Sequence, residues 1–124
     1  MQTRIKKNFD ILNKLKESTV IPFVSGGDPD VKQSTEILKS FAKNGARILE
    51  CGFNWNAPVS DGDPIQNSSY RALKNGAYIE KVFEIIKEFR KIIVRQIIGV
   101  NVVKRTDKSI GECPQLLFII SFAD

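Results

Sequence analysis

The chain has 124 residues, of which 42% are hydrophobic and 27% are charged, and these values predict a soluble globular protein of one domain. No apolar run approaches the ~20 residues of a membrane helix, and the basic N-terminus lacks the apolar centre of a signal peptide. The net charge of +5 is dispersed among acidic residues instead of concentrated on one stretch. This dispersal argues against a nucleic-acid surface, so we expect neither a nucleic-acid nor a membrane partner.

Cys51 and Cys113 are the two cysteines, and they lie far apart without the spacing of a metal site. We therefore expect no disulfide framework, no metal centre and a reducing, cytoplasmic location.

The N-terminal half alternates helix and strand signals. Apolar residues at spacings of four, three and three predict an amphipathic helix over 2–17, and the β-branched run 19–24 predicts a buried strand. Asp28 before Pro29 predicts a helix over about 29–44, with Asp28 as its N-terminal cap and Pro29 in its first turn.

The same alternation continues after Asn44-Gly45, which ends that helix. We predict a second strand over 46–51, a loop over 52–64, helices over 65–73 and 79–89, and a third strand within 92–103. Strands that alternate with helices in this way predict a parallel α/β sheet. The apolar run 116–120 is a candidate fourth strand, without a helix after it.

Two carboxylates form the main candidate site. Glu50 ends an apolar run, and Asp61 lies eleven positions later in a loop rich in Gly, Pro and Asn. Because the chain has no histidine, carboxylates at the mouth of a strand are its natural candidates for proton transfer to and from a small substrate. Alternatively, Glu50 faces solvent or pairs with Arg47 or Arg71, and Asp61 is an ordinary turn residue.

Two further features have alternative interpretations. Phe23, at the end of the first predicted strand, lines an apolar pocket or packs in the core. The pair Gly26-Gly27 forms an anion-binding nest or, more simply, a turn.

Residues 1 to about 92 resemble the N-terminal portion of the tryptophan synthase alpha chain family. The resemblance rests on an ordered set of signatures, which are Arg4-Ile5 with Phe9, Ile21–Pro29, Asn44–Ala46, Leu49–Gly52, Asp61-Gly62, Ile65-Gln66 and Arg71–Gly76. It implies a (β/α)₈ barrel that cleaves indole-3-glycerol phosphate to indole and glyceraldehyde 3-phosphate, in tryptophan biosynthesis.

By the same resemblance, Glu50 is the catalytic acid/base, Asp61 is the second catalytic carboxylate and Phe23 lines the indole pocket. The resemblance implies no cofactor in this chain and a beta chain partner that carries pyridoxal phosphate. The sequence departs from the family in the loop after Glu50, where Asn54 stands in place of a proline and Ala57 in place of an acidic residue.

A complete barrel of this kind takes about 250 residues. We therefore expect residues 1–124 to form a single partial barrel of about three to four βα units, in which 93–124 have diverged, as in a truncated or frameshifted copy. The family's phosphate-binding loops belong to later units, so we expect negligible turnover from this chain alone. Uncovered strand edges predict marginal stability, aggregation or self-association. The alternatives are a non-catalytic interaction module of the same family and another sugar-phosphate barrel enzyme.

Overall fold

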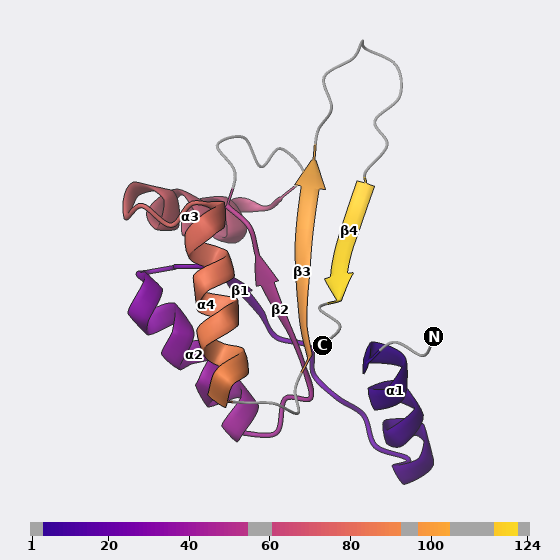
Figure 1. Cartoon of the computed structure of the whole chain (residues 1–124). Coiled ribbons are helices and arrows are strands. Elements are labelled where there is room, and N and C mark those ends of the chain that lie inside the picture. Colours follow the sequence, from indigo (N-terminus) through magenta and orange to yellow (C-terminus); the bar gives the residue numbers. More distant parts are fainter. Residues whose placement is uncertain (1–3, 55–60, 93–96, 105–115, 122–124) are drawn as a thin grey trace, which may run out of the picture.

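The computed structural model describes residues 4–54 and 61–92, together with the backbone of two later strands over 97–104 and 116–121. The elements in chain order are α1 (Arg4–Leu15), β1 (Phe23–Ser25), α2 (Val31–Lys43), β2 (Ile48–Gly52), α3 (Asp63–Lys74), α4 (Ile79–Ile92), β3 (Ile97–Lys104) and β4 (Leu116–Ser121). Figure 1 shows one sheet, with α2 and α4 beside it and α1 apart from both. In the described part of the chain, no helix is long and apolar enough to span a membrane.

The sheet has the order β1-β2-β3-β4. The first three strands are parallel, with Phe23 opposite Glu50 and Glu50 opposite Gly99. This confirms the parallel arrangement that the alternation of helices and strands predicted. The run 116–120 does form a strand, but β4 pairs with β3 in the antiparallel sense. The parallel order therefore ends at β3.

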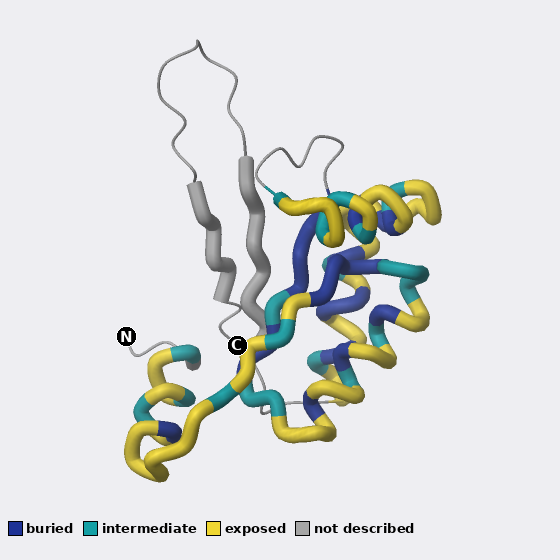
Figure 2. Tube along the Cα trace, turned by 180° about the vertical axis from the view of Figure 1, so that it is seen from behind, coloured by how far each residue is buried: buried dark blue, intermediate teal, exposed yellow. Residues whose placement is uncertain are grey.

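The hydrophobic core lies between the sheet and the two helices α2 and α4. Its largest fully buried side chains include Leu49 of β2, Leu38 of α2 and Phe89 of α4. In β2, alternate residues point to opposite faces, so Leu49 and Cys51 face these helices while Glu50 faces away from them. Figure 2 shows the burial concentrated where the strands meet the helices.

The N-terminal segment is less covered than the rest. Leu12 of α1 is buried, whereas Phe9 and Leu15 on the same predicted face are 42% and 53% exposed. The predicted strand 19–24 is shorter than expected, since β1 begins only at Phe23. In Figure 2, the connection from α1 to β1 runs largely along the surface.

The prediction that Asp28 caps α2 was wrong. Asp30 is the N-terminal cap, with its side chain accepting a hydrogen bond from the Gln33 backbone N–H at 2.9 Å. Asp28 instead binds Arg71 on α3, so an acidic residue predicted to serve its own helix joins two elements. The predicted helix ends are confirmed, because Asn44 and Asn75 are the C-terminal caps of α2 and α3, each followed by a glycine with positive φ.

Candidate active site

Glu50 lies in the middle of β2, on the face of the sheet turned away from α2 and α4. We call this surface the Glu50 face, and it consists of the alternate residues Phe23, Ser25, Ile48, Glu50 and Gly52. Phe23 is the register partner of Glu50, and paired residues of parallel strands point to the same side. The structure therefore brings two of the three predicted site residues together, an aromatic ring and a half-buried carboxylate.

The Phe23 ring packs directly over Gly52 on the Glu50 face. A Cβ atom at position 52 would lie 2.5 Å from Cζ and 2.8 Å from Cε2 of Phe23, so only glycine leaves room for the ring. Phe23 is 39% exposed. It is not a fully buried core residue, and it presents an apolar surface beside the carboxylate.

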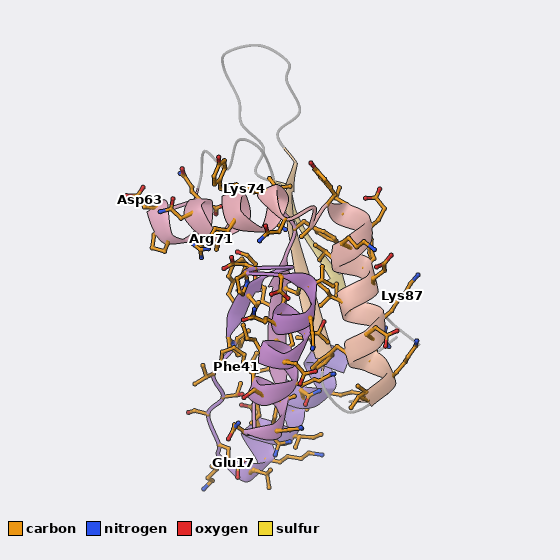
Figure 3. The ribbon with its side chains drawn as sticks, turned by 90° about the vertical axis from the view of Figure 1, so that its left-hand side faces the viewer. Glu17, Phe41, Asp63, Arg71, Lys74 and Lys87 are labelled. Carbon is orange, nitrogen blue, oxygen red and sulfur yellow. The ribbon has the colours of Figure 1, made fainter. Side chains whose placement is uncertain are left out.

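Asp61 precedes α3, and its backbone carbonyl accepts a hydrogen bond from Gln66 Nε2 at 2.6 Å. Figure 3 shows α3 lying across the end of the sheet, with Asp63 at the end of the helix far from α4 and Lys74 at the near end. Asp61 therefore stands beside the start of α3, two residues before Asp63. Residues 55–60, which connect the two halves of the predicted site, lie outside the described residues.

The basic residues suggested as alternative partners of Glu50 bind other carboxylates. Arg47 Nη2 lies 3.6 Å from a carboxylate oxygen of Glu17. Arg71 donates through Nε and Nη2 to the two carboxylate oxygens of Asp28, both at 2.9 Å. These hydrogen bonds and the attraction of the Asp28 charge raise the pKa of Arg71. The two-pronged geometry ties α3 to the β1–α2 turn.

The Gly26-Gly27 pair is a turn. The Gly26 N–H donates to the carbonyl oxygen of Gly52 at 2.9 Å, and the Gly27 N–H donates to Ser34 Oγ at 3.0 Å. The next N–H, of Asp28, donates to the Ser25 carbonyl oxygen at 3.1 Å. With these three donors directed at protein oxygens, the turn does not present them to an anion.

Sequence reasoning missed a set of polar side chains that join the loops at this end of the sheet. Ser25 and Ser68 share a hydrogen bond of 2.6 Å between their hydroxyl oxygens, and Asn75 Nδ2 donates to the Pro29 carbonyl oxygen at 2.6 Å. Asn54 is buried and donates to two different turns. A serine or asparagine near a turn is usual in any loop, so only the tertiary contacts distinguish these residues.

Burial makes Cys51 an inert core residue, because desolvation raises the pKa of its thiol to about 12. Cys113 lies outside the described residues. Among the residues the structure describes, no group of three acidic or cysteine side chains is arranged to hold a metal ion.

The parallel strands with intervening helices, and an acidic side chain on the strand face away from those helices, define a segment of a (β/α)₈ barrel of the TIM type. Comparison with known proteins identifies which barrel. The family model for the tryptophan synthase alpha chain matches residues 9–104. This chain belongs to the tryptophan synthase alpha chain family.

Individual relatives agree with this assignment. The tryptophan synthase alpha chain of Pelagibacter ubique is 50% identical over 76 residues, which are 61% of this chain and 28% of that protein. The alpha chain of Trichormus variabilis is 40% identical over 85 residues, covering 68% of this chain and 32% of that protein. The chain thus spans about a third of the length of the curated relatives it matches.

Solved structures show the same fold. Tryptophan synthase subunit alpha from Legionella pneumophila superposes with a TM-score of 0.77 at 25% identity, over 81% of this chain and 38% of that one. A chain of the tryptophan synthase complex from Pyrococcus furiosus superposes with a TM-score of 0.63 at 36% identity, over 67% of this chain and 34% of that one. The fold is therefore that of a partial alpha-type barrel.

Proposed function

We propose that residues 1–124 form a single partial barrel domain that supplies the first βα units of an alpha-type lyase, which cleaves indole-3-glycerol phosphate to indole and glyceraldehyde 3-phosphate. The observation that carries the proposal is the pairing of Phe23 with Glu50 on one face of the sheet. A half-buried carboxylate beside an exposed aromatic ring suits a substrate that joins an indole ring to a hydroxylated chain.

The proposed chemistry needs two proton movements. The bond between the indole ring and the glycerol chain breaks as the ring carbon gains a proton and the neighbouring hydroxyl loses one to become an aldehyde. Glu50 acts as the acid/base for these transfers, since its position on β2 places it on the face that a barrel encloses. Asp61 is the second carboxylate and stabilises the positive charge that develops on the indole N–H. Phe23 lines the pocket for the ring.

This reaction needs no cofactor on the alpha-type chain, and the partner beta chain carries pyridoxal phosphate. We expect both chains to work in the cytoplasm. The solved Pyrococcus furiosus relative is a tryptophan synthase complex, which supports a beta chain as the partner. A polypeptide of these 124 residues alone should show negligible turnover, since the family resemblance assigns phosphate binding to later βα units.

A fusion protein tests the site. Residues 1–92 of this chain would be joined to the remaining barrel of the Pelagibacter ubique relative, and indole release from indole-3-glycerol phosphate would be followed. We expect E50Q and D61N each to reduce kcat by about 100-fold or more. The matched controls are E36Q on the outer helix α2 and D63N, two residues beyond Asp61. Equal activity of E50Q and E36Q would refute the role of Glu50.

The alternative function is a non-catalytic interaction module. A pull-down of the 124-residue chain with a cognate beta chain distinguishes the two proposals. Binding together with an inactive fusion protein would favour the interaction module, whereas an active fusion protein that loses activity in E50Q supports the lyase.

A further inference from the structure

Asn54 is a buried polar side chain that joins two turns to the end of β2. It is 5% exposed, and its Nδ2 group donates to the carbonyl oxygens of Gly26 at 2.6 Å and Ala77 at 3.0 Å. Gly26 belongs to the turn after β1, and Ala77 belongs to the turn between α3 and α4. Since both partners are acceptors, the amide is oriented with both of its N–H groups directed at them.

The oxygen atom of the Asn54 side-chain amide, in contrast, makes no hydrogen bond to the described residues. This atom, Oδ1, is buried. An unpaired buried acceptor costs free energy. The side chain keeps this position despite that cost because Nδ2 donates two hydrogen bonds. We therefore infer that these two hydrogen bonds determine where the Asn54 side chain lies.

Asn54 lies two residues after the end of β2, where the chain leaves the strand that carries Glu50. The next described residue along the chain is Asp61, and its carbonyl oxygen is held by Gln66 Nε2 at 2.6 Å. The Gln66 N–H also donates to the Gly62 carbonyl oxygen at 3.1 Å. Each end of the connection between Glu50 and Asp61 is thus held by a side-chain amide.

We propose that Asn54 and Gln66 are positioning residues, which together set where Asp61 stands relative to Glu50. The importance of this placement for catalysis rests on the proposed function, whereas the placement itself does not. The resemblance puts a proline at position 54, and a proline restricts the backbone through its ring. In this chain, two hydrogen bonds from a side chain supply the restriction in its place.

The first experiment uses the full chain and compares two asparagines. The readout is the ¹³Cγ signal of the Asp61 carboxylate, which is sensitive to where that group stands. We expect N54A and the isosteric N54D to shift the ¹³Cγ signal of Asp61, because both variants lose the two donors. N75A removes the hydrogen bond from Asn75 Nδ2 at the end of α3 to the Pro29 carbonyl oxygen, and it should leave the Asp61 signal unchanged.

The second experiment keeps the proposal testable if the Asn54 variants do not fold. Q66L breaks the hydrogen bond to the Asp61 carbonyl oxygen, and the matched control Q33L breaks one of equal length, 2.6 Å, from α2 to its N-terminal cap Asp30. We expect the Asp61 signal to move in Q66L and to stay in Q33L. An unchanged Asp61 signal in Q66L would overturn the proposal. Indole release is not used in either experiment, so failure of the proposed function would be seen separately.

Discussion

Gly27 offers the sharpest test of how the loops at the end of the sheet are packed. Its φ is +87°, a conformation in which L side chains are strained, and a Cβ atom would lie 2.3 Å from the Cβ of Ala77. Gly45 has a similar φ of +96°, but a Cβ atom there would meet nothing within 4 Å. Replacing each glycine by alanine thus applies similar backbone strain at both sites and a steric clash at only one.

The expected free energies follow from these two terms. Left-handed strain costs about 1–2 kcal/mol, and the reduced freedom of the unfolded chain returns about 0.4–1 kcal/mol at either site. Overpacking against a buried neighbour adds about 1–3 kcal/mol at Gly27 alone. We therefore expect G27A to lower the free energy of unfolding by about 1–3 kcal/mol more than G45A does.

Urea unfolding of the two variants measures this difference directly. Ala77 is the neighbour that the new Cβ would strike, and it is fully buried. Adding A77G to G27A removes that neighbour's Cβ atom, so part of the lost stability should return. If G27A were no less stable than G45A, the close approach of the β1–α2 turn to the α3–α4 turn would be refuted.

The remaining predictions concern individual ionisable groups. The unfolded Cys51 thiol loses its proton above about pH 9, whereas the folded thiol retains it to about pH 12. The free energy of unfolding should therefore fall in this range by up to about 1.4 kcal/mol per pH unit. The C51A variant should lack this slope in urea unfolding at about pH 9–11. The hydrogen bond from the Gln33 N–H lowers the pKa of Asp30. The ionised Asp30 therefore stabilises the fold above its unfolded pKa, and this contribution is lost as the pH falls below about 4. The melting temperature of D30A should lack this decrease at acidic pH. R71K should lower the melting temperature through loss of the two-pronged bond to Asp28, and 1 M salt should shrink the difference from the parent; an equal melting temperature at low salt would contradict this.

The sequence predicted the fold well where local signals and burial agree. The alternation of apolar residues placed α2, β2, α3 and α4 within a few residues, and the Asn-Gly pairs marked two helix ends. It failed where two local signals compete. Asp28 and Asp30 flank the same proline, and only the position of Arg71 on α3 draws Asp28 away from its own helix. The antiparallel sense of β4 likewise could not be predicted from the apolar run 116–120, because such a run is compatible with either strand direction.

For the candidate site, the sequence by itself determined the residue types, a glutamate at the end of an apolar run, an aspartate before a helix and a phenylalanine on the neighbouring strand. Only the tertiary structure decided that Phe23 and Glu50 share a face, because register is set by pairing between strands distant in the chain. It also decided the role of Asn54, whose two acceptors lie 28 and 23 positions away along the chain. Hydrogen bonds between residues so far apart leave no local pattern in the sequence, so they can be identified only in the folded structure.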